Sequence, residues 1–278
     1  MESKFFKARR IMENVTMIAG LAGELCYLIE GREKALLVDG LSGVGSLKAF
    51  VRELTDLPVE LVLTHGHPDH GGAAFEYGRT YIHPDDIASL YETGDAERRF
   101  AFASGGAAGF RLRKEDTVPC VPVATLPMED GQRFDLGGTV LEAIAVPGHT
   151  WGSVVLLDRA ARVVYSGDAV NSNTLLVTGG ASIEQYRESM EHLRSFAGFY
   201  DVLWGGHGGV SVPKTIVDEA VELCGEIMAG TDEQIPGDFM GWTALYAKAK
   251  DEAFRRLDGG LANIAYSKDR IWKRQVTK

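Results

Sequence analysis

Residues 59–70 of the chain read VELVLTHGHPDH. The aliphatic run at the start, Val59–Leu63, predicts a short β-strand that is buried on both faces. The loop behind it packs four potential metal ligands into six residues: His65, His67, Asp69 and His70. The two outer histidines of His-Gly-His are two residues apart in an extended segment, so their side chains point to the same side. The aspartate and the last histidine follow one turn later, where the chain curls toward a helix. The arrangement can therefore supply ligands to two adjacent metal positions.

Three further strand ends carry the same kinds of side chain. Each follows a glycine, which lets the backbone approach an ion or a substrate closely, and the residues are His149, Asp168 and His207. Imidazole and carboxylate ligands suit zinc, and also iron or manganese. A single histidine is usually a surface or core residue, but here four strand-end loops carry candidate ligands. The pattern therefore predicts a metal site.

The rest of the chain falls into two similar halves, each with hairpin strands, a helix, and a strand that ends in a histidine loop. The first half is expected to contain strands at Val15–Ala19, Leu25–Ile29 and Ala35–Val38 and a helix at Ser46–Leu57. The second is expected to contain strands at Val140–Val146, Val154–Leu157, Val163–Tyr165 and Val202–Trp204. Its helices are expected to open at Ser182, with Gln185 in a capping box, and at Pro213. Each sheet must be covered, which predicts an α+β fold of two sheets packed face to face with helices outside.

Two segments resist this pattern. The stretch from Gly94 to Asp116 is rich in glycine and arginine and is expected to be an irregular loop or lid, in which Arg98, Arg99, Arg111 and Arg113 could bind an anion. Residues 231–278 are more polar and are expected to form a helical extension. The predicted organisation is therefore a two-sheet domain that carries the metal ligands over residues 1–230 and a C-terminal helical extension over residues 231–278.

The charge composition indicates which classes of binding partner the protein is expected to have. The 278 residues include 29 Lys and Arg and 39 Asp and Glu, a formal net charge of −10. An acidic protein repels phosphate backbones and anionic lipids, so we predict that it binds neither nucleic acid nor membranes. No apolar run reaches the ~18 to 20 residues of a membrane span, and the charged N-terminus lacks the apolar core of a signal peptide. The expected partner is a small-molecule substrate, the expected location is the cytoplasm, and a homo-oligomer is left open.

At its histidine loops the sequence resembles the metallo-β-lactamase-fold hydrolase superfamily. The match comprises His-x-His-x-Asp-His at 65–70, the later Gly-His at 149, Gly-Asp at 168 and Gly-His at 207, and an early strand-end aspartate, Asp39. The resemblance spans about residues 15 to 210 and implies an αββα sandwich of two mixed sheets. It also implies two divalent metal ions, expected to be zinc with iron or manganese as alternatives.

The same resemblance assigns roles to the individual residues. It implies that His65, His67 and His149 hold the first metal. It implies that Asp69, His70 and His207 hold the second, with Asp168 bridging the two. Asp39 would orient a ligand histidine.

Such a centre is expected to hydrolyse a small ester or thioester through metal-bound hydroxide, with Asp69 as the catalytic residue that accepts or shuttles the proton. Common β-lactamases of the superfamily have a cysteine where this chain has Asp168, which argues against antibiotic hydrolysis. Glyoxalase II shares all seven ligands and has a helical C-terminal domain, so the chain is similar to it. The alternatives are a phosphodiesterase, a phosphatase or a lactonase on the same metals, and a non-hydrolytic metal-binding protein or an iron protein that reacts with oxygen.

Overall fold

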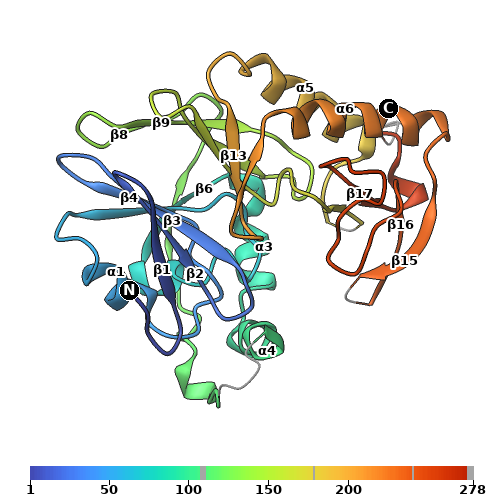
Figure 1. Cartoon of the computed structure of the whole chain (residues 1–278). Coiled ribbons are helices and arrows are strands. Elements are labelled where there is room, and N and C mark those ends of the chain that lie inside the picture. Colours follow the sequence, from blue (N-terminus) through green and yellow to red (C-terminus); the bar gives the residue numbers. More distant parts are fainter. Residues whose placement is uncertain (107–110, 178, 240, 274–278) are drawn as a thin grey trace, which may run out of the picture.

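The computed structural model describes residues 1–106, 111–177, 179–239 and 241–273, and its fold is shown in Figure 1. Within these residues the N-terminal half builds a seven-stranded mixed sheet in the order β1 to β7. Its strands are β1 (Lys7–Met12), β2 (Val15–Ala19), β3 (Leu25–Glu30), β4 (Ala35–Val38), β5 (Val59–Val62), β6 (Arg79–Ile82) and β7 (Ala124–Pro127). Neighbours from β1 to β4 pair antiparallel, and those from β4 to β7 pair parallel.

The second half of the described chain builds a six-stranded sheet. Its order is β14 (Ser211–Pro213), β13 (Val202–Gly205), β11 (Val163–Gly167), β10 (Val154–Asp158), β9 (Val140–Ala145) and β8 (Arg133–Asp135). The two sheets bury a shared apolar layer, in which Tyr27 of β3 meets Tyr165 of β11 with ring centroids 5.1 Å apart. The predicted face-to-face packing is therefore confirmed.

Helices cover the outer face of each sheet. The first sheet carries α1 (Leu47–Arg52), α2 (Ala74–Tyr77), α3 (Ile87–Glu92) and α4 (Ala96–Gly106), and short 3₁₀ turns lie at η1 (Pro84–Asp86) and η2 (Lys114–Asp116). The second carries α5 (Ile183–Ser195) and α6 (Thr215–Ala229), whose apolar faces pack on the strands through Met190, Leu193 and Val217. These layers form the α+β, αββα sandwich that the sequence predicts.

The helix α5 begins as its sequence indicates. The Ser182 hydroxyl accepts a hydrogen bond from the Gln185 backbone N–H at 3.2 Å, and the Gln185 side chain accepts one from the Ser182 backbone N–H at 3.2 Å. This reciprocal capping box satisfies two N–H groups that the first turn would otherwise leave unpaired.

The expectation of an irregular lid at residues 94–116 is wrong for most of the segment. Residues 96–106 form α4, and residues 107–110 lie outside the described part. Arg99 explains the order, because its fully buried guanidinium donates hydrogen bonds to the carbonyls of Gly94, Ser42 and Val118. Five donors in a planar fork can join several chain segments at once, so this arginine fastens the helix to the loops that contain Ser42 and Val118 instead of facing a ligand.

The prediction of a helical C-terminal extension over residues 231–278 is wrong. Over its described residues it forms the strands β15 (Ile235–Phe239), β16 (Trp242–Tyr246) and β17 (Ile264–Tyr266), followed by the 3₁₀ turn η3 (Lys268–Arg270). Pro236 and Gly237 disfavour a helix, and aromatic and β-branched residues favour strands. Residues 274–278 lie outside the described part.

These strands belong to a sheet that also takes a strand from the body of the chain. β17 pairs in parallel with β12 (Thr174–Leu176), and the described strands follow the order β12, β17, β16, β15. Figure 1 shows β15, β16 and β17 beside α6, on the side away from β1 to β4. The extension is thus joined to the segment that follows Asp168, and the division of the chain at residue 230 stays a prediction.

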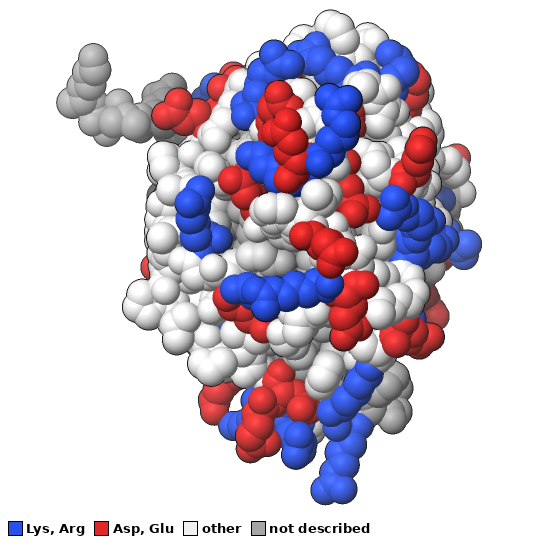
Figure 2. All heavy atoms as spheres, turned by 90° about the vertical axis from the view of Figure 1, so that its left-hand side faces the viewer, with Lys and Arg blue, Asp and Glu red and all other residues white. Residues whose placement is uncertain are grey.

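Figure 2 shows one face of the molecule, on which Lys and Arg side chains lie among Asp and Glu side chains. No helix of the described chain has the length and apolarity needed to cross a bilayer. The absence of nucleic-acid and membrane partners, the homo-oligomer and the cytoplasmic location stay predictions.

Candidate metal centre

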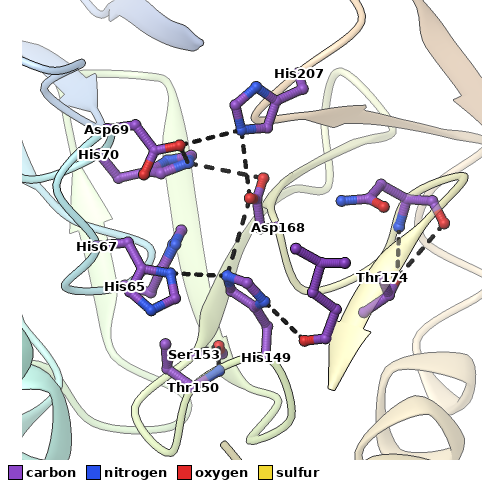
Figure 3. Close-up of polar contacts among 12 residues, drawn as sticks. His65, His67, Asp69, His70, His149, Thr150, Ser153, Asp168, Thr174 and His207 are labelled. Atoms are coloured by element: carbon purple, nitrogen blue, oxygen red, sulfur yellow. Dashed lines mark hydrogen bonds and ion pairs between the residues drawn. The ribbon is translucent and has the colours of Figure 1, made fainter. Parts of the chain in front are cut away.

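The candidate ligands gather because parallel strands end at the same sheet edge. β4 and β5 pair in parallel with Val38 opposite Val62, so Asp39 and the loop from His65 to His70 leave the sheet together. In the second sheet β11 and β13 pair in parallel, which brings Asp168 and His207 side by side. Figure 3 shows the side chains of His65, His67, Asp69 and His70 facing those of His149, Asp168 and His207. All seven sequence-predicted ligands lie at this place.

Three histidines make the first ligand group, which we name the three-histidine group: His65, His67 and His149. One ring nitrogen from each lies within 4.8 Å of the others. The Nδ1 of His67 and the Nε2 of His149 are 2.9 Å apart. These three residues would hold one ion, because imidazole nitrogens are preferred ligands of zinc.

Two carboxylates and two histidines make the second ligand group, which we name the mixed group: Asp69, His70, Asp168 and His207. The Nε2 of His207 is 3.4 Å from Asp69 Oδ2 and 3.4 Å from Asp168 Oδ2. The Nε2 of His70 is 3.7 Å from Asp69 Oδ2 and from Asp168 Oδ1. Four donors therefore converge on one point.

Asp168 connects the two groups. Its Oδ2 is 3.9 Å from the Nε2 of His149, in the three-histidine group, and its Oδ1 faces His70 in the mixed group. A carboxylate placed between two cation positions can contact both and offset their mutual repulsion. Asp168 therefore lies between the two ligand groups, within 4 Å of a histidine of each.

Hydrogen bonds on the far nitrogens fix the ligand rings. His70 Nδ1 lies 2.9 Å from Asp39 Oδ2, His149 Nδ1 lies 2.9 Å from the Leu175 carbonyl, and His65 Nδ1 lies 3.1 Å from the Thr64 hydroxyl. Such partners set the tautomer that points the other nitrogen at an ion. Asp39 also accepts bonds from the backbone N–H and hydroxyl of Thr64, at 2.7 and 2.9 Å. The orienting role expected of Asp39 agrees with these contacts.

Unpaired buried atoms indicate that the site fits a cation. His65 Nε2, His70 Nε2 and Asp168 Oδ1 are buried without a hydrogen-bond partner in the described structure. Leaving such groups unpaired costs about 1–3 kcal/mol each, and all three belong to the ligand groups. Their nitrogen and carboxylate donors are those preferred by zinc, iron and manganese.

The two groups differ in charge. Burial, reinforced by His149, lowers the pKa of His67 to about 3, and burial also holds the pKa of His65 well below its usual range. In the mixed group burial opposes the charge on His207, but Asp168 outweighs it and raises the pKa to about 10. His65 and His67 are therefore neutral, as ligands must be. In the mixed group, binding of a cation would release protons from histidine.

Two glycines, Gly167 and Gly206, let the backbone lie close to the ligand side chains. A Cβ on Gly206 would lie 2.5 Å from the ring of His70 and 2.6 Å from Asp168 Oδ1. Gly167 has a φ of +48° and backs directly onto Thr64. A side chain at position 206 would displace His70 and Asp168, and one at position 167 would displace Thr64, whose hydroxyl contacts the His65 ring.

Asp86 is a site residue that the sequence analysis missed. Its side chain is buried, with Oδ2 accepting hydrogen bonds from Gly66 N–H and Thr150 Oγ1, both at 2.7 Å, and Oδ1 accepting one from Gly152 N–H at 2.8 Å. It thus joins the loop of His65 and His67 to the loop of His149. No motif marks it, because its partners are 20, 64 and 66 residues away.

Two further histidines, one asparagine and two of the arginines predicted to bind an anion do not belong to the ligand groups. His192 lies near Asp130 on the surface, and the His83 ring accepts a bond from the Asp85 N–H. Asn171 forms a local turn by accepting a hydrogen bond from the Asn173 N–H at 2.8 Å. Arg98 pairs with Asp95, and Arg113 lies near Asp116.

Two face-to-face sheets with paired histidine and aspartate groups at one edge define a metallo-hydrolase class of protein. The sequence model of the Metallo-beta-lactamase superfamily matches residues 19–198. The chain belongs to this superfamily.

Relatives with curated names are distant. The chain is 27% identical over 168 residues to the acyl-coenzyme A thioesterase MBLAC2 of Homo sapiens, a match that covers 54% of this chain and 59% of that protein. The chain therefore spans less than two thirds of that relative. It is 34% identical over 189 residues to an uncharacterized protein of Mycobacterium leprae, covering 63% of this chain and 82% of that protein.

Solved structures share the fold. A metallo-beta-lactamase from Pontibacter korlensis superposes with a TM-score of 0.58 at 16% identity, covering 78% of this chain and 97% of that one. The DIM-1 metallo-beta-lactamase superposes with a TM-score of 0.57 at 17% identity, covering 80% and 97%. At these identities the likeness concerns the fold alone.

Proposed function

We propose that the protein is a dinuclear metal-dependent hydrolase of an ester or thioester. The observation that carries the proposal is the position of Asp168 between the three-histidine group and the mixed group. We assign the first ion to His65, His67 and His149, and the second to Asp69, His70 and His207, with Asp168 shared. Zinc is the proposed metal, with iron or manganese as alternatives.

When bound, two divalent ions lower the pKa of water and polarise a substrate carbonyl. The chain's own part is to hold the ligands and to handle protons. Asp69 is the proposed catalytic residue, because its carboxylate is partly exposed and lies 3.4 Å from His207 Nε2. The neighbouring histidines keep its pKa lowered although burial opposes this, so it is ionised and able to accept a proton from an attacking water.

Two observations support a thioester over a phosphoester. The named relative is an acyl-coenzyme A thioesterase, although the match covers 59% of it. Two of the four arginines that could have formed an anion-binding lid have other contacts: Arg99 is buried against backbone carbonyls, and Arg98 pairs with Asp95. No contact among the described residues favours phosphodiester or lactone hydrolysis.

The test measures zinc content and initial hydrolysis rates on acyl thioesters, a lactone and a phosphodiester. We expect two zinc ions per chain and a kcat/KM on a thioester above about 10⁴ M⁻¹s⁻¹, the range of real enzyme–substrate pairs. His149→Ala and His207→Ala should each lose one ion and most of the activity, whereas Asp69→Asn should lose activity with the fold retained.

His192→Ala is the matched control, since this histidine lies on α5 outside the site. Loss of activity in that variant would indicate a general effect of replacing histidine. Full zinc occupancy with background rates on esters and thioesters, or faster turnover of the phosphodiester, would overturn the proposal.

A further inference from the structure

A cavity of about 840 Å³ opens beside the metal centre, between the C-terminal sheet and α5. Trp151, two residues beyond His149, lines it from one side, and Val177, two residues beyond the Leu175 that holds His149, lines it from another. Its volume falls within the ~300 to 1,000 Å³ typical of small-molecule sites. A molecule bound in the cavity would therefore lie next to the ligand loop of the three-histidine group.

Three tryptophans from distant parts of the sequence meet in this cavity. Trp151, Trp242 and Trp272 line it, and they are 44%, 54% and 55% exposed. Large aromatic side chains normally bury most of their surface. Three half-exposed indoles around one cavity offer flat faces on which a planar ring can stack.

The polar residues that line the cavity indicate which other chemical groups a bound molecule with a planar ring would carry. Arg270 borders the cavity and donates a hydrogen bond to the Gly180 carbonyl, and no carboxylate in the described part of the chain forms an ion pair with it. Lys273 also lines the cavity but is paired with Glu188 at 2.6 Å. Asp269 contributes one negative charge to the wall. Arg270 is therefore the main group able to bind an anion, and its fork suits phosphate.

The N-terminus of α5 does not compete for this role. The backbone N–H of Glu184 bonds to the Ile271 carbonyl, and that of Gln185 bonds to the Ser182 hydroxyl. These first-turn donors are already used. An anion in the cavity would be held by the arginine side chain.

The alternative occupant, a hydrocarbon chain, fits the lining poorly. Ser182, Gln185, Thr243 and Ser267 border the cavity together with the charged residues. A methylene chain would remove these groups from water without offering them hydrogen bonds, which is costly. Stacking faces beside a cation and several hydroxyl and amide groups suit a base with a sugar and phosphate.

We propose that this cavity binds the nucleotide part of a nucleotide-bearing acyl thioester, that is, the adenine and phosphates of an acyl-coenzyme A. The inference rests on the proposed thioester hydrolysis and deepens it. The C-terminal strands supply Trp242, and the 3₁₀ turn behind β17 supplies Arg270 and leads to Trp272. The segment after residue 230 would then select the leaving group, while the sandwich carries the metal ligands.

The test has a binding arm and a kinetic arm. Adenosine 3′,5′-bisphosphate is titrated into the zinc-loaded protein and followed by calorimetry and tryptophan fluorescence. Acetyl-coenzyme A is compared with S-acetyl-N-acetylcysteamine, a thioester without a nucleotide. We expect Trp242→Ala, Trp272→Ala and Arg270→Ala each to weaken binding and raise KM for acetyl-coenzyme A about tenfold. Turnover of the nucleotide-free thioester should not change.

Phe199→Ala and Arg255→Ala are the controls, since both side chains are exposed and outside the cavity lining. The inference would be overturned if the bisphosphate did not bind at a concentration of about 1 mM, because a Kd above that value corresponds to a weak binding free energy. Equal KM changes on both thioesters would also overturn it, as would changes that follow acyl-chain length instead of the nucleotide.

The two proposals fail differently. Binding of the bisphosphate through Trp242 and Arg270 without hydrolysis of any thioester would retain the subsite and reject the proposed reaction. Hydrolysis of the nucleotide-free thioester with no nucleotide binding would retain the proposed reaction and reject the nucleotide subsite.

Discussion

The Asp86 carboxylate accepts a 2.7 Å hydrogen bond from the backbone N–H of Gly66, the residue between His65 and His67. Through Thr150 and Gly152 the same carboxylate holds the loop that follows His149. One buried acid thus sets the distance between the two loops that supply the three-histidine group. It contacts none of the ligand rings and is a positioning residue.

Removing this acid should loosen the three-histidine group. Outer partners of metal ligands typically contribute about 10- to 100-fold to metal affinity, so Asp86→Ala should lower zinc affinity by that amount. Asp86→Asn should also lose affinity, because an amide nitrogen cannot accept the bonds that the N–H and hydroxyl groups donate. Competition with a chelator measures the change.

The background His207→Ala sharpens this measurement, because the remaining ion should then sit at the three-histidine group. Asp85→Asn is the matched control, since the Asp85 side chain is next to Asp86 in the sequence and is 63% exposed. Unchanged zinc affinity in Asp86→Ala would show that the loops keep their distance without the carboxylate.

Asp39 has the corresponding role for the mixed group. It orients His70 Nδ1 at 2.9 Å and has a φ of +68°, a conformation that aspartate and asparagine tolerate better than most residues. Asp39→Asn therefore keeps the backbone and removes the charge. We expect about 10- to 100-fold weaker zinc binding at the mixed group, measured in a His149→Ala background. Asp39→Ala should in addition lower the melting temperature, and equal zinc affinity in all three proteins would contradict the assignment.

The metal ligands could be predicted from the sequence, whereas Asp86 could not. His65, His67, Asp69 and His70 lie within six residues, and Asp168 and His207 directly follow strands, so their patterns were readable. Asp86 acts through partners on distant loops, and only the folded chain brings them together. The C-terminal strands were missed because they are only five, five and three residues long. The strand β12, with which β17 pairs, also lies about ninety residues earlier in the chain, since Thr174 is opposite Ile264.

Metal removal should destabilise the fold at the sheet edge. Without an ion, His65 Nε2, His70 Nε2 and Asp168 Oδ1 stay buried without partners. Zinc at a hundred times its Kd should add about 2.7 kcal/mol per site to the free energy of unfolding. Thermal unfolding with chelator and with added zinc measures this gain. His149→Ala and His207→Ala should each lose part of it, and a melting temperature independent of zinc would contradict a preformed site.

A last prediction concerns Glu24, whose carboxyl is fully buried next to this edge and accepts a 2.9 Å hydrogen bond from the Ala22 N–H. Burial raises its pKa above the ordinary value, although hydrogen bonds from Ser42 and Ala22 oppose the shift. The folded protein therefore binds this proton more tightly than the unfolded chain does. Stability from the protonated form is fully present below the unfolded pKa, and it is lost as the pH rises through the folded pKa.

Glu24→Gln removes this loss because the amide stays neutral at every pH. The free energy of unfolding of the variant, minus that of the wild type, should increase between pH 4.5 and pH 8. The increase should exceed about 0.5 kcal/mol, the usual size of the effect of a surface substitution. Urea unfolding at both pH values measures the difference, with Glu115→Gln as the control for an exposed glutamate. Titrations shared by both proteins, including those of the metal ligands, cancel in the comparison. A difference of the opposite sign would mean that Glu24 is held as a carboxylate by a stabilising partner, and that its charge supports the folded state.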